Sequence, residues 1–193
     1  MLKTDEEIMI DFQSGNNQAV SELFARYKKP VFNFALRIVG NRADAEDATA
    51  EVFLNLFKKH YQYTTGVKFS TWLYTIARNS CIDRLRKRKQ AVSLNYQAKD
   101  GETVEWEIED AASVTDQEAI HKETKQLVKQ AIAKLDEEQR QAIVLREYQG
   151  LSYEQIAQVM GCSLEKIKIL IFRARERLKG ELASYLKEES GDE

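Results

Sequence analysis

The stretch LSYEQIAQVMGCSLEKIKILIFRAR, residues 151–175, decides how the C-terminal part of this chain folds. Ser152 and Gln155 have the spacing of a capping box, which predicts the start of a helix. Gly161 then favours a left-handed turn that ends this helix, and Ser163 is placed to cap the next one. Two helices joined in this way, with small residues at their contact, are typical of a helix-turn-helix, whose second helix enters the DNA major groove.

The second of these helices carries a row of positive charge. The six basic residues are Lys166, Lys168, Arg173, Arg175, Arg177 and Lys179. An ordinary helical hairpin is the alternative interpretation, but a hairpin would not need this row of charge. Cations suit phosphates because binding releases counterions, although such contacts carry no information on base sequence. The stretch therefore favours binding to nucleic acid.

A second cationic helix is predicted by FSTWLYTIARNSCIDRLRKRKQ, residues 69–90. One side of it is apolar around Leu73 and Ala77, and the opposite side is polar and cationic. Residues 76–90 hold six basic residues and one acidic residue, a net +5, in a chain whose net charge is −2. Such a stripe ordinarily means a solvated face. Beside a separate helix-turn-helix it favours a second contact with nucleic acid, and two linked modules suit two spaced DNA elements.

Composition and periodicity predict an all-α fold. The 193 residues include one proline and eight glycines, and no strand-like alternation is sustained. We expect two small helical domains joined by a flexible linker, with the helix-turn-helix in the second domain. Residues 96–124 hold two basic and nine acidic residues, a net −7, and lack a helical stripe. The bounds are residues 1–90 for the N-terminal domain, 91–118 for the acidic linker, 119–186 for the C-terminal domain and 187–193 for an acidic tail.

Particular residues are expected to mark helix ends and one contact of the linker. Thr4 and Glu7 predict a capping box at the first helix. Ser70 is expected to cap the fourth helix, and Asp136 a helix of the second domain. Trp106, an apolar residue in the acidic segment, is expected to dock on the rest of the protein.

The sequence argues against a membrane protein and against a metal site. No apolar run approaches the roughly 18 residues of a bilayer span, and the acidic N-terminus lacks a signal layout, so we expect a cytoplasmic protein. Cys81 and Cys162 stand far apart inside helical patterns and are expected to be small buried thiols. With His60 and His121 as the only histidines and no Cys-x-x-Cys, we expect neither zinc nor another cofactor.

Three stretches together resemble the extracytoplasmic-function (ECF) sigma factors, the small two-domain class of bacterial RNA polymerase initiation subunits. DAEDATAEVFLNLF, residues 44–57, is similar to the helix of that family that binds core polymerase. The stretch 69–88 is similar to the helix that meets the −10 promoter element, and 151–175 to the helix-turn-helix that reads the −35 element. The resemblance covers about residues 4–90 and 119–182, in the family's order and spacing.

For residues 44–57 the resemblance implies an acidic and apolar patch that docks on the clamp helices of the polymerase. The implied residues are Asp44, Glu46, Asp47, Glu51, Val52, Asn55 and Leu56. Paired carboxylates alone would also suggest a metal or acid–base site. A hydrolase that uses them is a rival function, but the chain lacks a candidate nucleophile, a phosphate-binding glycine loop and metal-ligand histidines.

The resemblance also implies that the loop of residues 61–68 holds a base flipped out of the −10 element. Tyr61 and Tyr63 would stack on this base, and Thr64 and Thr65 would hydrogen-bond to it. The other residues implied at the −10 element are Lys68, Thr75, Arg78, Asn79, Asp83, Arg84, Arg86, Lys87 and Arg88. Those implied at the −35 element are Ser152, Tyr153, Ser163, Glu165, Lys166, Lys168, Ile169, Arg173 and Arg175.

The chain departs from the family at Ile169 and Leu170, where the family usually carries Ser-Arg. We expect Ile169 to face the groove, where an aliphatic side chain can contact a thymine methyl group but cannot donate a hydrogen bond. Leu170 is expected to pack inward. Phosphate anchoring by Lys166, Lys168 and Arg173 is unaffected, so the departure bears on base choice.

The resemblance implies a transcription initiation factor, not an enzyme. It would bind core RNA polymerase through the clamp helices and flap, bring it to promoter DNA and help to open that DNA. An anti-sigma factor is implied as a further partner. The alternative is a free-standing regulator that dimerises on a palindrome through its helix-turn-helix. Such a regulator footprints DNA alone, whereas a sigma factor needs core enzyme.

Overall fold

Helices make up every element of the described part of the chain. The computed structural model describes residues 3–94 and 116–190, with side chains for 3–90 and 124–183. The elements are α1 (Asp5–Gln13), α2 (Ala19–Val39), α3 (Arg42–Lys59), the 3-10 turn η1 (His60–Gln62), α4 (Phe69–Leu94), α5 (Asp116–Ala133), α6 (Glu137–Glu147), α7 (Tyr153–Met160) and α8 (Leu164–Ser190). The all-α prediction is confirmed. None of the helices in these ranges is both long and apolar enough to cross a bilayer.

Both ends of the segment that was expected to be a linker, residues 91–118, are helical. α4 continues to Leu94, and α5 begins at Asp116. Residues 95–115 lie outside the described part of the chain, and the expected docking of Trp106 lies there with them.

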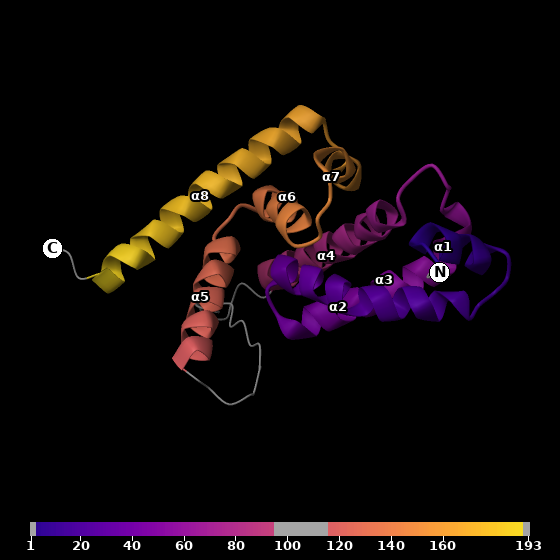
Figure 1. Ribbon diagram of the computed structural model, residues 1–193, viewed down its shortest axis with the longest axis horizontal. Helices are drawn as coiled ribbons and strands as arrows, with labels where there is room; N and C mark the ends of the chain where they lie inside the picture. The colour runs from indigo at the N-terminus through magenta and orange to yellow at the C-terminus, as the bar shows by residue number, and fades with distance from the viewer. Residues whose placement is uncertain (1–2, 95–115, 191–193) are drawn as a thin grey trace.

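Helices α1–α4 pack around a common apolar core and form the lower right part of Figure 1. α2 packs against both α3 and α4. Phe12, Phe34 and Phe69 are fully buried, and the ring of Phe34 meets that of Tyr74 edge-on at 5.4 Å. Burial of such large side chains, more than helix propensity, stabilises helices of this length. The packing fixes α3 and α4, which carry the candidate polymerase-binding and −10 residues.

The predicted local structure of the helix-turn-helix is confirmed. Ser152 and Gln155 form the reciprocal hydrogen bonds of a capping box at the start of α7. Gly161 follows α7 in the left-handed region, with φ 64°. Ser163 Oγ then accepts a hydrogen bond from the Lys166 N–H (3.2 Å), which caps α8. Because side chains with a Cβ rarely adopt this conformation, Gly161 is the residue that allows the sharp turn between the two helices.

The start of α1 is confirmed, but the start of α4 differs from the expectation. Thr4 and Glu7 form the predicted capping box. Ser70 does not cap α4, because the helix begins one residue earlier, at Phe69. The Phe69 N–H instead donates to Glu6 Oε1 of α1 (3.0 Å). A carboxylate from another helix therefore replaces the local cap.

Asp136 is the N-cap residue of α6, yet its side chain makes no capping hydrogen bond. The Asp136 carboxylate points to α8, where Oδ2 lies 3.3 Å from Arg177 Nη1. An ion pair has replaced the predicted local interaction.

Of the two cysteines that were expected to be buried, Cys81 is fully buried and Cys162 is half-buried. Burial raises the pKa of the Cys81 thiol to about 12.

α8 packs its apolar side against α5, α6 and α7 and keeps the opposite side open. The buried residues on its first turns are Ile167, Leu170, Ile171 and Ala174. Leu170 is 8% exposed, whereas Ile169 is 50% exposed. The expected division between these two neighbours is therefore confirmed.

The two helical groups pack directly on each other. α4 lies against α7, and α2 lies against α5 and α6. In Figure 1, α6 and α7 lie between α8 and the α1–α4 bundle. Buried apolar side chains from both groups form one continuous cluster. This arrangement decides which candidate binding residues face solvent.

The opposite environments of Leu170 and Ile169 predict opposite effects on stability. Leu170→Ala is expected to lower the free energy of unfolding by about 2–5 kcal/mol, because it leaves a cavity in the core. Ile169→Ser should change it by less than about 0.5 kcal/mol, as substitutions of exposed residues do. Urea denaturation of both variants checks this. A strongly destabilised Ile169→Ser protein would contradict the orientation of α8.

Candidate polymerase-binding and nucleic-acid-binding surfaces

Three cations of α8 form ion pairs with carboxylates at the two ends of α6. The pairs are Lys166 with Glu138 (2.8 Å), Arg177 with Asp136 (3.3 Å) and Arg175 with Glu147 (2.7 Å). The hydrogen bond from Lys166 to Glu138 raises the pKa of Lys166, and Glu147 likewise raises the pKa of Arg175. All six side chains are largely exposed, so the pairs contribute little to stability. The cations therefore remain accessible to a polyanion.

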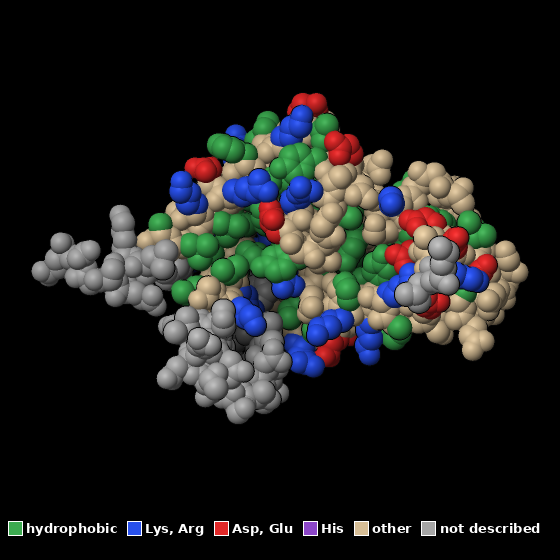
Figure 2. Space-filling view, in the orientation of Figure 1, with side chains coloured by type: hydrophobic (Ala, Val, Ile, Leu, Met, Phe, Trp, Pro, Cys, Tyr) green, Lys and Arg blue, Asp and Glu red, His purple; other side chains and the backbone are tan. Residues whose placement is uncertain are grey.

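Lys168 and Arg173 are exposed as well, and within the described ranges neither forms an ion pair. Glu165 is exposed on the first turn of the same helix. Figure 2 shows lysine and arginine side chains beside apolar ones over the region where Figure 1 draws α8. The outward side of α8 is thus a mixed cationic and apolar surface.

Three further candidates of the helix-turn-helix make contacts within the protein. Ser152 and Ser163 accept hydrogen bonds as helix caps. The ring of Tyr153 lies 5.2 Å from the guanidinium of Arg146, at a distance that suits a cation–π contact. These residues hold α7 and α8 in place.

Arg84, expected to contact DNA, links α4 to α3. Its Nη1 lies 2.7 Å from Asp47 Oδ2, and its Nε lies 4.0 Å from Glu51 Oε2. Both carboxylates belong to the candidate polymerase-binding residues. Arg84 therefore neutralises part of that acidic surface and does not point freely into solvent.

The rest of the cationic end of α4 is more open. Arg86 pairs with Asp83 one turn earlier (3.1 Å) and stays 68% exposed at its side chain. Lys87 is exposed, Arg88 is half-buried, and Lys89 Nζ lies 3.4 Å from Glu137 of α6. This end of the helix thus presents three exposed cations, Arg86, Lys87 and Lys89, of which Arg86 and Lys89 are paired.

The middle of α4 faces the second helical group. Arg78 Nε donates to Gln141 Oε1 of α6 (2.7 Å), and burial lowers the pKa of the Arg78 guanidinium. One turn earlier, the hydroxyl of Tyr74 donates to Gln149 Oε1. Thr75 is half-buried, with its hydroxyl donating to the Thr71 carbonyl oxygen (2.9 Å). Among the candidates here, Asn79 alone is classed as exposed.

The loop before α4 presents one of its two tyrosines. Tyr61 is 68% exposed, but Tyr63 is 3% exposed and does not offer its ring to a base. Its ring packs edge-on against Trp72 (5.6 Å), and its hydroxyl donates to the Val67 carbonyl oxygen (2.8 Å). The expectation that both would stack is wrong for Tyr63, because an aromatic cluster inside the bundle takes up its ring.

Other groups in this loop are either exposed or anchored by α1. Thr64, Thr65 and Lys68 are exposed, as a base-binding loop would require. Gln13 of α1 donates from Nε2 to the carbonyl oxygens of His60 (2.7 Å) and Tyr63 (2.9 Å). The backbone of the loop is therefore held at its N-terminal end by a side chain of the first helix.

The acidic surface of α3 keeps its carboxylates, but two of its expected apolar residues are wrong. Val52 and Leu56 are fully buried, because they belong to the face that packs on α2 and α4. The exposed apolar residues are Leu54 and Phe57, at 59% and 50%. The sequence did hold a signal for these exposed residues, namely the dense apolar run of residues 52–57. One buried face of a helix does not need so many apolar residues in succession.

The polar candidates of α3 are engaged with neighbours at the surface. Asp44 Oδ2 accepts from Asn41 Nδ2 (2.6 Å), and Glu46 pairs with Arg42 (2.9 Å). Asn55 is half-buried. Within the described ranges, no group of three or more possible metal ligands gathers.

Each of the two helical groups matches a known protein family. Residues 23–91 match the sigma-70 region 2 family, and residues 125–178 match the sigma-70 region 4 family. The RNA polymerase sigma-H factor of Pseudomonas aeruginosa is 31% identical over 187 residues, which is 95% of this chain and 96% of that protein. The ECF sigma-E factor of Escherichia coli is 30% identical over 190 residues, 95% of this chain and 97% of the relative.

The chain belongs to the ECF class of the sigma-70 family. It is therefore a bacterial transcription initiation factor that works with RNA polymerase. The sigma factor RpoE of Bartonella quintana, solved in complex with the anti-sigma factor NepR, matches its fold with a TM-score of 0.70 and 27% identity, covering 85% of this chain and 96% of that one. CnrH, solved with the cytosolic domain of CnrY, has the same TM-score at 22% identity, covering 94% and 99%, and supports the fold alone.

The two sigma regions hold each other through polar contacts around the buried cluster. The guanidinium of Arg37 lies over the ring of Tyr148 at 3.9 Å. Arg140 Nη1 approaches the Ile38 carbonyl oxygen at 3.4 Å. These two contacts join region 4 to α2, whereas the Arg78–Gln141 contact covers part of the α4 surface that the family resemblance assigns to the −10 element. In this sigma factor, the glutamines of region 4 were the residues that sequence reasoning missed.

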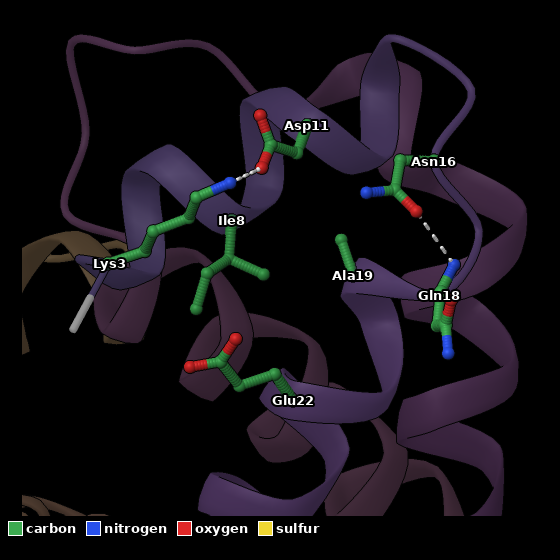
Figure 3. Close-up of a pocket in the computed structure, with 7 residues that line it drawn as sticks. All are labelled: Lys3, Ile8, Asp11, Asn16, Gln18, Ala19 and Glu22. Atoms are coloured by element: carbon green, nitrogen blue, oxygen red, sulfur yellow. Dashed lines mark hydrogen bonds and ion pairs between the residues drawn. The ribbon is translucent and has the colours of Figure 1, made fainter. Parts of the chain in front are cut away.

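A pocket of about 400 Å³ lies between α1 and the start of α2, and none of the residues that line it is a candidate polymerase-binding or DNA-binding residue. Figure 3 shows its lining, in which Lys3 reaches Asp11 and the Gln18 N–H donates to Asn16 Oδ1 (3.2 Å). The carboxylate of Glu22 pairs with Arg26, which lies outside the lining. We assign this pocket no ligand.

The contact between the two regions predicts a change of shape on its removal. Combining Arg37→Ala with Gln149→Ala removes a cation–π contact and a hydrogen bond, both between regions. The radius of gyration of the free protein, measured by small-angle X-ray scattering, is expected to increase. Arg42→Ala, which breaks an exposed pair within α3, is the matched control and should leave it unchanged. An unaltered radius in the double variant would contradict the importance of these contacts.

Proposed function

We propose that this sigma factor binds core RNA polymerase through α3, the −10 element through α4 and its preceding loop, and the −35 element through α7 and α8. The observation that carries the proposal is the open side of α8. Its cations stand on a helix whose other side is buried in a helix-turn-helix, and Gly161 sets the turn. A recognition helix needs one buried side and one cationic side.

At the polymerase, the proposed contact combines acidic groups with exposed apolar residues. Leu54 and Phe57 provide the apolar part, in place of Val52 and Leu56. Asp44, Glu46, Asp47, Glu51 and Asn55 provide the polar part. Exposed large apolar residues beside charge are typical of protein-binding surfaces, whose centres are apolar and whose rims are polar. The partner surfaces proposed are the clamp helices and, for region 4, the flap.

At the −10 element, Tyr61 is the proposed stacking residue, with Thr64 and Thr65 as hydrogen-bonding groups beside it. A single exposed aromatic ring and short hydroxyl side chains suit one unstacked base. The cationic end of α4, chiefly Arg86 and Lys87, then contacts phosphates. Arg78 and Asn79 join the contact once region 4 moves away from α4.

Access to both promoter elements therefore requires the two regions to separate. In the arrangement described, Gln141 and Gln149 of region 4 occupy hydrogen-bonding groups of α4. Binding of each region to its own site on core polymerase supplies the free energy for separation, because the polymerase binds the separated form better. This accounts for a requirement for core enzyme in DNA binding.

We extend three further expectations to this chain. An anti-sigma factor is a partner, by analogy with the Bartonella quintana sigma factor solved with NepR. The protein acts in the cytoplasm, where its polymerase is. It is not an enzyme and uses no cofactor.

Run-off transcription tests the proposal as a whole. The purified protein is added to core polymerase on genomic fragments, and discrete transcripts with a common upstream sequence are expected. Core polymerase alone is the control and should give no such transcripts. A protein that footprints a palindromic site without polymerase, and leaves transcription by core enzyme unchanged, would instead be the free-standing dimeric regulator.

The cationic end of α4 gives a second test, based on salt dependence. Arg86→Ala combined with Lys87→Ala should weaken promoter binding by holoenzyme and lower the slope of log affinity against log salt by about 2, since each phosphate contact contributes about 0.9. Lys28→Ala with Lys29→Ala removes the same charge from α2 and should leave the slope unchanged. An equal slope in all three proteins would make the α4 charge a solvated face.

Arg84→Ala is expected to behave differently from that double variant. Because Arg84 pairs with Asp47 and approaches Glu51, its loss should also lower affinity for core polymerase. Core affinity measured by fluorescence anisotropy separates the two variants. Equal core affinities in both would mean that Arg84 does not organise the surface of α3.

A further inference from the structure

The outward side of α8 carries two exposed apolar residues where a recognition helix meets DNA. Ile169 is 50% exposed and Phe172 is 66% exposed. They are three residues apart on the helix, so their side chains are neighbours on one face. The family resemblance did not single out Phe172, and the polar Ser-Arg pair usual in the family is replaced by Ile169 and Leu170. The centre of this recognition surface is therefore apolar.

Cations flank this apolar centre on both sides. At 3.6 residues per turn, Lys166, Arg173 and Arg177 fall on one side of the Ile169–Phe172 pair. The residues on its other side are Lys168, Arg175 and Lys179. The ion pairs agree with this division, since Lys166 and Arg177 reach carboxylates at the start of α6, whereas Arg175 reaches Glu147 at its end. At the same spacing, Glu165 and Glu176 fall in line with the pair, one toward each end of the helix. Two exposed apolar side chains therefore occupy the middle of a strip that lies between two rows of positive charge.

This charge pattern is complementary to the major groove of duplex DNA. There, two phosphate backbones run on either side of the base edges. Each cationic row can meet one backbone, which places Ile169 and Phe172 over the base edges between them. A protein partner would have to present two parallel acidic rows to match the same surface. The duplex is therefore the occupant that the charges favour.

We propose that Ile169 and Phe172 recognise thymine methyl groups in the −35 element. Among the base edges in the major groove, the 5-methyl group of thymine is the one that apolar side chains can distinguish. Neither side chain donates or accepts a hydrogen bond, so neither reads guanine or adenine directly. Glu165 and Glu176 lie along the same face as acceptors and are unsuited to phosphate. The inference rests on the proposed binding of the −35 element by α7 and α8.

The test replaces thymine with uracil, which removes only the methyl group. Once run-off transcription has located a promoter, duplexes are made with deoxyuridine at one −35 thymine at a time. Holoenzyme affinity is expected to fall about fourfold for each methyl group that meets Ile169 or Phe172. Deoxyuridine in the spacer between the two elements is the control and should have no effect.

Variants assign the contact to a residue. In Ile169→Ser holoenzyme, replacing one particular thymine with uracil should no longer lower the affinity. In Phe172→Ser holoenzyme, the same should hold for a neighbouring thymine. Such a double-substitution cycle isolates the pairwise contact from other effects of each change. Lys168→Ala should instead weaken binding to thymine and uracil duplexes alike. Because the uracil measurements on the unaltered protein need no variant, they stand whether or not a variant folds.

Several outcomes would overturn the inference. A −35 element without thymine, or equal affinity for thymine and uracil at every position, rules out methyl recognition while leaving the sigma function intact. Variants that weaken core binding but not promoter binding would assign the apolar strip to a protein partner. If the holoenzyme binds no promoter at all, the proposed function fails first.

Discussion

Several of the cations on α4 and α8 are already paired with the protein's own carboxylates, and this pairing affects both of the cationic helices. On α8, three of the cations meet Asp136, Glu138 and Glu147 of α6. On α4, Arg84 meets Asp47. Exposed pairs of this kind contribute less than about 1 kcal/mol, so a phosphate can replace a carboxylate at little cost. The pairs nevertheless hold long side chains in defined directions and reduce the net field that would attract any polyanion. Binding is then an exchange of partners, which favours sites where many phosphates are offered together.

The packing of region 4 on region 2 occupies polar groups of α4 in the same way as the ion pairs occupy single cations. The contacts that join them are mixed, with a shared apolar cluster and two hydrogen bonds that Tyr74 and Arg78 of α4 donate to glutamine side chains of region 4. Contacts between domains in one chain are generally of modest size, so relative motion is the ordinary expectation. A polymerase that binds the two regions at separate places can therefore open the protein. In the proposed function, the free protein and the bound protein would thus differ in which groups of α4 are available, while each region keeps its fold.

Local sequence signals predicted local structure well. The capping boxes at Thr4 and Ser152 and the turn at Gly161 depend on residues within a few positions of each other, and all three are present. The two wrong caps, Ser70 and Asp136, were decided by partners far along the chain, Glu6 and Arg177. Helical periodicity likewise placed Leu170 inward and Ile169 outward.

Periodicity was less informative where a residue belongs to a motif and to the core at once. Tyr63 lies in a loop that the family uses for DNA, yet its ring completes an aromatic cluster with Trp72. Val52 and Leu56 lie in the polymerase-binding stretch, yet they form its buried face. A family motif marks a segment, and only packing tells which of its side chains are presented. The contacts from Gln141 and Gln149 to α4 could not be read from the sequence, because they depend on how two regions meet.

The first helix is more than the beginning of the bundle. Glu6 accepts a hydrogen bond from the Phe69 N–H at the start of α4, and Gln13 donates to the carbonyl oxygens of His60 and Tyr63. Helix α1 therefore holds the loop of residues 61–68 at both of its ends. The stiffness of that loop is consequently set by a segment that touches neither DNA nor polymerase in the proposed function. In the proposed function, substitutions in α1 would therefore change how the loop holds a −10 base, while every side chain that meets the base stays the same.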